Sequence, residues 1–292
     1  PEAVKRWHKE QLRGIHITNH STGFEFQMAY VGLGIDLDEQ GCTFGDVAHY
    51  AALLDDHRKQ FRLEFLVRDE LGADEAKVLE VASHKIDPSR MMEYPAGMVA
   101  VRAMADVRQV RKLKQIYWPK MTAEELHEVR KLEEELIPVV AEMERNGCRL
   151  DMELLERWLK ETEQEVLRIQ WQIAKEIGFQ MNLSKSANAD WTRFFEKLKI
   201  PITHWTSGGK TGKPKPSFTD ENVEDMLGGN EHPLVRKAMR GANLVSLRSK
   251  YLIPYWNRVK ADPQGLLRYN LHQLACDEGG TVSGRFSSSD VN

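Results

Sequence analysis

The chain has 292 residues, of which 41% are hydrophobic and 29% are charged, and its formal net charge is −3. This length allows two ordinary domains, and the composition is that of a globular protein. No apolar run approaches the ~20 residues of a membrane span, so no membrane segment is expected. Cys42, Cys148 and Cys276 are odd in number and far apart. They form neither a disulfide framework nor a zinc motif, which indicates a reducing, intracellular setting.

The sequence of roughly the first 115 residues predicts a mixed α/β fold. A short strand-like run, RGIHITNH, precedes a helix or turn in GFEFQMAYVGLG and an amphipathic helix in FGDVAHYAALLDD. Another helix, in QFRLEFLVRDELG, is closed by Gly72. A long helix then starts near YPAGMVAV, and we expect it to end at Pro119 because proline lacks a backbone donor.

From Thr122 onward the sequence is almost wholly helical. Thr122 and Glu125 have the spacing of a capping box. Gly147 ends that helix, and Asp151 caps the next, which is predicted to reach Ile177. Farther on, the glycines and prolines of HWTSGGKTGKPKPS predict a mobile basic tip without regular structure. The final segment, GLLRYNLHQLACDEGGTVSGRFSSSDVN, is strand-like at first and then a loop.

Basic residues are concentrated in two stretches that contain no carboxylate, at 197–219 and 232–261. For one stretch alone, a solvated helix face with uneven charge is the simpler interpretation. The terminal SGRFSSSDVN also carries a guanidinium and several hydroxyls. Together with the two basic stretches, it favours the phosphate backbone of a nucleic acid as the partner.

The sequence SGRFSSSDVN resembles the template-binding motif of the family A DNA polymerases, which begins Thr-Gly-Arg-Leu-Ser-Ser. The matching positions are Gly284, Arg285, Ser287, Ser288 and Asn292, and the departures are Ser283, Phe286 and Val291. Four other stretches resemble the family in the expected order. LIPVVAEMERNGCRLD resembles the opening of the thumb, NLSKSA the Asn-Leu-Asn-Ser turn, GGKTGKPKPSFT the thumb tip, and LVSLRSKYL the Leu-Lys-Ser-Thr-Tyr helix. The resemblance is specific over roughly residues 132–292 and looser before them.

The resemblance implies three parts. Residues 1–120 would be an α/β exonuclease-like domain of ribonuclease H-like fold, N-terminally incomplete because the chain starts at Pro1 without a methionine. Residues 121–260 would be a mainly α-helical polymerase thumb, and 261–292 the first strands of a palm. The palm and fingers, with the carboxylates that hold Mg²⁺, would lie on a missing or separate segment. The chain alone is therefore not expected to extend a primer.

The resemblance also implies the partner and the contacts. The partner is primer-template DNA, in the cytoplasm of a bacterial or phage-infected cell. Every base pair offers the minor groove an acceptor in nearly the same place, which suits the Arg285 guanidinium beside Gly284. Asp277 and Glu278 are interpreted as a surface loop, because the family's palm acid pair follows this motif. The expected DNA-binding residues are Asn182, Ser184, Lys185, Lys210, Lys213, Lys215, Arg248, Lys250, Arg285, Ser287, Ser288 and Asn292.

The family's 3′–5′ exonuclease domain holds two metal ions with carboxylates from three motifs. Glu25 matches the second motif, with Ser21 where the family has asparagine, and Asp106 matches the third. These two are the candidate catalytic and metal-binding residues. Arg102 stands where the family has tyrosine and would compete with a metal, and the first motif would precede Pro1. We therefore expect a degenerate domain kept for structure.

Two other interpretations of the whole chain stay open. One is a standalone metal-dependent 3′–5′ exonuclease with a helical DNA-binding arm. The other is a non-catalytic DNA-binding module. Degradation of single strands by this chain with metal would favour the first of these, whereas primer extension after addition of a palm would favour the polymerase.

Overall fold

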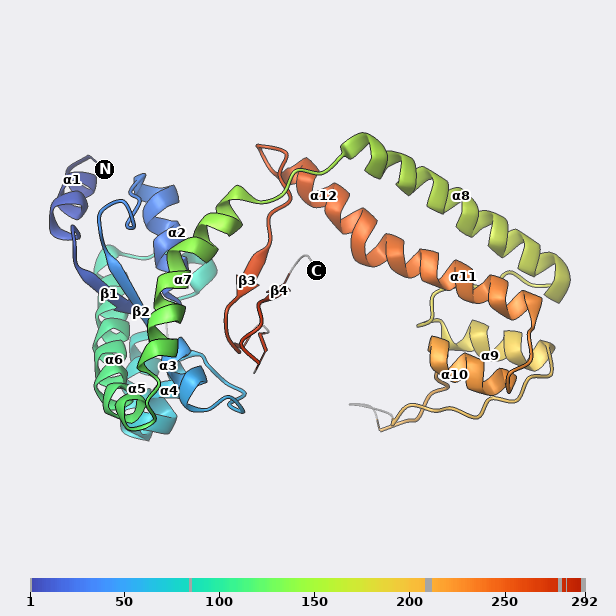
Figure 1. Cartoon of the computed structure of the whole chain (residues 1–292), viewed down its shortest axis with the longest axis horizontal. Helices are drawn as coiled ribbons and strands as arrows, with labels where there is room; N and C mark the ends of the chain where they lie inside the picture. Colours follow the sequence, from blue (N-terminus) through green and yellow to red (C-terminus); the bar gives the residue numbers. More distant parts are fainter. Residues whose placement is uncertain (1, 84–85, 208–211, 278–279, 282, 290–292) are drawn as a thin grey trace. The chain divides into compact units, whose positions relative to one another are not determined.

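A computed structural model describes residues 2–83, 86–207, 212–277, 280–281 and 283–289. They form two compact units, drawn in Figure 1. The first unit comprises Pro1–Gly147 and Arg268–Asn292, and the second comprises Cys148–Leu267. Among the described residues, no helix combines the length and the apolarity needed to cross a membrane.

The first unit contains a two-stranded parallel sheet. Helix α1 (Glu2–Gln11) leads to β1 (His16–Asn19), and α2 (Thr22–Leu33) makes the crossover to β2 (Thr43–Asp46). Parallel strands need such a crossover, because a tight hairpin cannot join them. The strand-like run in RGIHITNH is confirmed, but β2 was not predicted. Its last three residues, Phe44 to Asp46, lie in the segment FGDVAHYAALLDD that we expected to be helical, and α3 (Val47–Leu54) begins only after them.

After β2, the first unit continues with helices as far as Gly147. They are α3, α4 (Leu63–Leu71), α5 (Ala73–Ser83), the 3-10 helix η1 (Pro88–Glu93), α6 (Ala96–Ala123) and α7 (His127–Asn146). Gly72 ends α4, as predicted. One apolar core joins α3, α4, α5 and α6 around Tyr50, Leu66 and Leu113. A second core, around Phe26, Phe44 and Ile137, joins α2, β2 and α7.

The boundary between α6 and α7 differs from the prediction. Helix α6 runs through Pro119 to Ala123, because Tyr117 and Met121 are fully buried and their packing holds the last turn. The Thr122 hydroxyl donates to the Trp118 carbonyl at 3.0 Å inside that turn, and Glu125 has a φ of 56°. The capping box is therefore wrong, since α7 begins only at His127.

The second unit is helical. It contains α8 (Met152–Ile177), α9 (Asn188–Lys197), α10 (Asp220–Leu227), α11 (Pro233–Leu247), a π-helical turn (Arg248–Leu252) and α12 (Ile253–Ala261). Helices α8 and α11 lie side by side (Figure 1). The Asp151 carboxylate accepts from the Leu154 N–H at 2.9 Å, so the predicted cap of α8 is confirmed. The buried core includes Ile169, Trp191, Phe194 and Val235.

The stretch between α9 and α10 is more regular than predicted. The Thr206 N–H donates to the Lys215 carbonyl at 2.8 Å, and the Ser217 N–H donates to the His204 carbonyl at 3.0 Å. Trp205 and Pro216 form the bridge between these two segments. The prediction of a tip without regular structure is thus wrong for 204–206 and 215–217. Lys210 lies outside the described residues.

The terminal segment forms a second, antiparallel pair of strands in the first unit. Strand β3 (Asn270–His272) pairs with β4 (Ser287–Ser289), with Leu271 opposite Ser288. We expected a strand followed by a loop, but the three serines form a strand because their backbone pairs with β3. Asn292 lies outside the described residues.

Candidate nucleic-acid interface

The turn before α9 is built from short polar side chains. The Asn182 side-chain oxygen accepts from the Ser184 N–H at 2.9 Å, and the Asp190 carboxylate accepts from the Asn182 N–H at 2.7 Å. The hydroxyls of Ser184 and Ser186 are 2.8 Å apart. Below them, the buried Trp191 indole donates to the Ser184 carbonyl at 3.0 Å. These bonds fix two hydroxyls at the start of a helix, where backbone N–H groups attract anions.

Lys185 ties this turn to two other helices. Its ammonium lies 2.8 Å from the Asp220 carboxylate at the start of α10 and 3.0 Å from the Asn243 side-chain oxygen on α11. The Lys185 ammonium, which we expected to contact phosphate, is therefore already paired within the protein. A phosphate would have to compete with Asp220 for this ammonium.

The other basic residues of the second unit that we expected to bind DNA fall into two kinds. Lys213, Lys215 and Lys250 are exposed. The Arg248 guanidinium is mostly buried instead: it donates to the Leu159 carbonyl and, at 2.8 Å, to the Thr162 hydroxyl. It thereby fastens the π-helical turn to α8. The three lysines have the exposure that a phosphate contact needs, whereas Arg248 has a structural role in this arrangement.

The Ser-Gly-Arg sequence forms a tight turn in the first unit. Gly284 has a φ of 69°, which suits glycine. The Thr281 hydroxyl donates to the Arg285 carbonyl at 2.7 Å, and the Ser287 hydroxyl accepts from the Gly280 N–H at 3.0 Å. The Arg285 side chain is exposed, while Ser287 and Ser288 are half-buried in β4. Ser287 is thus hydrogen-bonded within this segment, whereas the Arg285 guanidinium is exposed to solvent.

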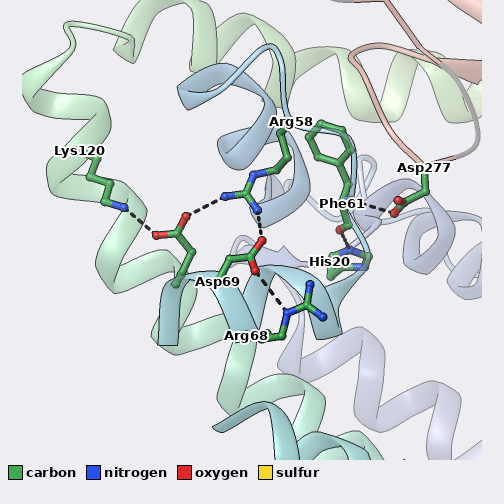
Figure 2. A network of polar contacts seen from close by, with 8 residues as sticks. His20, Arg58, Phe61, Arg68, Asp69, Lys120 and Asp277 are labelled. Atoms are coloured by element: carbon green, nitrogen blue, oxygen red, sulfur yellow. Dashed lines mark hydrogen bonds and ion pairs between the residues drawn. The ribbon is translucent and has the colours of Figure 1, made fainter. Parts of the chain in front are cut away.

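A polar network anchors the segment that precedes this turn (Figure 2). The Asp277 carboxylate accepts from the Phe61 N–H at 3.0 Å, and the Phe61 carbonyl lies 2.7 Å from His20 Nε2. Nearby, Arg58 bonds to the carboxylates of Asp69 and Glu70 on α4, and Lys120 of α6 bonds to Glu70 as well. Asp277 therefore ties its own segment to the loop before α4, and Glu278 lies outside the described residues.

The two exonuclease-like carboxylates come together from α2 and α6. Burial raises the pKa of Glu25, a hydrogen bond from Asn19 lowers it, and the negative charge of Asp106 raises it further. Burial also raises the pKa of Asp106, against the opposing effects of Arg102 and His20. Arg102 Nε lies 3.9 Å from the Asp106 carboxylate. The pair thus repels itself once both groups ionise, which is the electrostatic setting of a cation site.

The remaining donors do not complete a metal site. Within the described ranges, no three His, Cys, Asp or Glu side chains gather closely enough to hold an ion. Magnesium prefers several oxygen ligands in octahedral geometry, and here Arg102 already supplies a positive charge beside Asp106. The described residues of this pair therefore do not fit Mg²⁺ by themselves.

Comparison with known proteins gives one consistent picture. No protein-family model matches the chain. The DNA polymerase DpoZ of Acinetobacter phage SH-Ab 15497 is 23% identical over 96% of the chain, which spans 47% of that relative. The thermostable DNA polymerase I of Thermus filiformis is 30% identical over 66% of the chain, which spans 21% of it. The chain thus spans less than half the length of these relatives.

A solved structure shares the fold. It is the POL domain of Pol1 from M. smegmatis, in complex with DNA primer-template and dNTP. The match has a TM-score of 0.72 and 20% identity, and it covers the whole of this chain and 44% of that one.

Proposed function

From the premise that this chain is family A DNA polymerase-like, we propose that it is the primer-template-binding part of a DNA-directed DNA polymerase. In this proposal residues 121–260 are the thumb, residues 261–292 with β3 and β4 begin the palm, and residues 1–120 are an exonuclease-like domain. A palm and fingers segment, on the same or a second polypeptide, supplies the Mg²⁺-binding carboxylates for nucleotidyl transfer.

The observation that carries the proposal is the bonded turn before α9. Ser184 and Ser186 present their hydroxyls at a helix start, a position that binds phosphate without reading sequence. Exposed Lys213 and Lys215, on the paired stretch between α9 and α10, add positive charge in the same unit. Sequence-independent backbone contacts of this kind are what a polymerase needs, since it must move along any template.

The exonuclease-like domain is proposed to be degenerate. Glu25 and Asp106 interact electrostatically, but Arg102 lies beside Asp106 and the described residues offer no third ligand. The same observation argues against a standalone metal-dependent exonuclease. A non-catalytic DNA-binding module remains the second candidate, because the turn before α9 would serve it equally well.

Duplex binding by the whole chain tests the proposal. Changing Lys213 and Lys215 together to glutamine is expected to flatten the plot of log affinity against log salt concentration, by up to ~0.9 for each phosphate that is no longer neutralised. The measurement is titration of a fluorescent primer-template at several salt concentrations.

The matched control removes two lysines elsewhere. Lys131 and Lys160 are each paired with a glutamate four residues away on a helix surface. Their double change to glutamine alters the net charge equally and is expected to leave the slope unchanged. Equal slopes for both variants and the unmodified chain would contradict the assignment of the paired stretch to the DNA interface.

A further inference from the structure

A second cationic surface lies on the first unit, around the indole of Trp118. The Trp118 side chain, near the end of α6, is 40% exposed. Lys114, one turn earlier, places its ammonium 5.8 Å from the ring centroid, and the Arg130 guanidinium carbon on α7 is 4.6 Å away. The His127 ring centroid lies at 5.6 Å. We call Lys114, Trp118, His127 and Arg130 the Trp118 cluster.

The charges of this cluster are not balanced. Glu134 is the carboxylate that pairs with Arg130, and it also accepts from the Tyr50 hydroxyl at 2.5 Å. The Lys114 ammonium donates to the Thr18 hydroxyl at 2.7 Å, and none of the described carboxylates lies within ion-pair distance of it. Burial lowers the pKa of Lys114, Glu134 raises it and Arg130 lowers it, so one carboxylate acts on two cations. An added anion would therefore stabilise this half-buried ammonium.

The cluster and the carboxylate pair both interact with residues at or just after the end of β1. Thr18 bonds to Lys114 and Asn19, the last residue of β1, bonds to Glu25; His20, which follows the strand, acts electrostatically on Asp106. On α6, Lys114 follows Asp106 by eight residues, or about 12 Å at 1.5 Å per residue. The cluster is therefore a separate feature, about two helical turns along α6 from Asp106.

We propose that the Trp118 cluster binds single-stranded DNA, with a base stacked on the Trp118 indole and the neighbouring phosphodiester at Lys114. An exposed aromatic ring beside unpaired positive charge is the combination by which proteins hold single strands without reading sequence. This inference rests on the proposed function, because it takes DNA as the ligand. It adds a contact on the first unit, separate from the turn before α9.

The competing explanation is a structural clasp, in which the cation–π contacts only hold α6 against α7. The two explanations differ in what substitution changes. A clasp predicts reduced thermal stability with unchanged DNA affinity, whereas a strand-binding site predicts reduced affinity in a chain that remains folded.

The test is binding of a single-stranded oligothymidylate to the full chain at several salt concentrations. Trp118→Ala is expected to weaken binding about fivefold or more, the usual effect of removing one stacked base. Lys114→Met keeps the apolar stem and is expected to lower the salt slope by about 0.7, the value for one phosphate of a single strand. Lys112→Met is the matched control, because its ammonium is bound to Glu75 at 2.6 Å on another side of α6.

Trp118→Phe keeps a ring in place and provides a folded variant if alanine destabilises the chain; it is expected to retain most of the affinity. Inorganic phosphate at matched ionic strength is expected to displace little oligonucleotide, because it brings no base. Unchanged affinity in Lys114→Met and Trp118→Ala would overturn the inference, and so would displacement by phosphate alone. If Lys213 and Lys215 still set the salt slope for duplex DNA, the proposed function survives that outcome.

Discussion

Replacing Trp191 with alanine is expected to lower the free energy of unfolding by ~3–5 kcal/mol, the usual cost of removing a large aromatic side chain from a core. Trp191 is fully buried and its ring lies against Phe194, Phe195 and Phe218. The substitution leaves a cavity among these rings. It also removes the indole donor of the Ser184 carbonyl, so the turn before α9 should loosen and duplex affinity should fall as well.

Urea denaturation followed by near-ultraviolet circular dichroism measures the change in stability. Trp171 provides the matched control, since it lies on α8 in the same unit but is 65% exposed. Trp171→Ala is expected to change the free energy of unfolding by less than ~0.5 kcal/mol. Similar losses of stability from the two substitutions would show that Trp191 does not organise the core of the second unit.

Replacing Asp46 with alanine is expected to cost about 3 kcal/mol of stability in the first unit, because one buried carboxylate caps two helices. Asp46 is 2% exposed. One oxygen accepts from the Thr22 N–H at 2.6 Å at the start of α2, and the other accepts from the Ala48 N–H at 2.8 Å at the start of α3. Alanine would leave the buried Thr22 N–H and the partly buried Ala48 N–H without this partner.

Two further variants separate the parts of this effect. Asp46→Asn keeps one acceptor but turns an amide group toward the second N–H, so its cost should be intermediate. Asp151→Ala removes a single exposed cap, the bond to the Leu154 N–H, and should cost about 1 kcal/mol. Thermal unfolding of all three variants gives the comparison. An Asp46→Ala effect no larger than that of Asp151→Ala would contradict the double role.

Local signals in the sequence predicted several of the long helices, although α1 and α5 were not predicted. Asp151 caps the start of α8 and Gly178 caps its end. Such caps can be predicted locally, because each needs only a short polar side chain or a glycine at one position. The α6–α7 boundary could not be read this way. Pro119 and the Thr122–Glu125 spacing point to a break at 119, but burial of Tyr117 and Met121 by distant helices overrides these local preferences.

Pairings between distant segments were the least predictable. Strand β2 forms because its backbone meets β1, and β4 forms because the serines meet β3. In β2, Thr43 and Phe44 favour a strand but Gly45 and Asp46 disfavour it, and β4 consists of serines alone, without the β-branched or aromatic residues that favour strands. For the same reason, nothing in the sequence signalled that Lys185 would bond to Asp220 and Asn243, or that Arg248 would serve α8. The resemblance to polymerases suggested Glu25 and Asp106 as a carboxylate pair, which stays a prediction; in the structure the charge of Asp106 raises the pKa of Glu25.

Amide hydrogen exchange of the full chain, with and without primer-template DNA, tests most directly the central claim that the second unit binds the duplex. The account predicts slower exchange on DNA binding at 182–188, in the turn before α9, and at 204–206 and 215–217. Helix α5 should exchange equally in both states. Unchanged exchange at 182–188 in a chain saturated with DNA would contradict the account, because the duplex would then be held by another part of the protein.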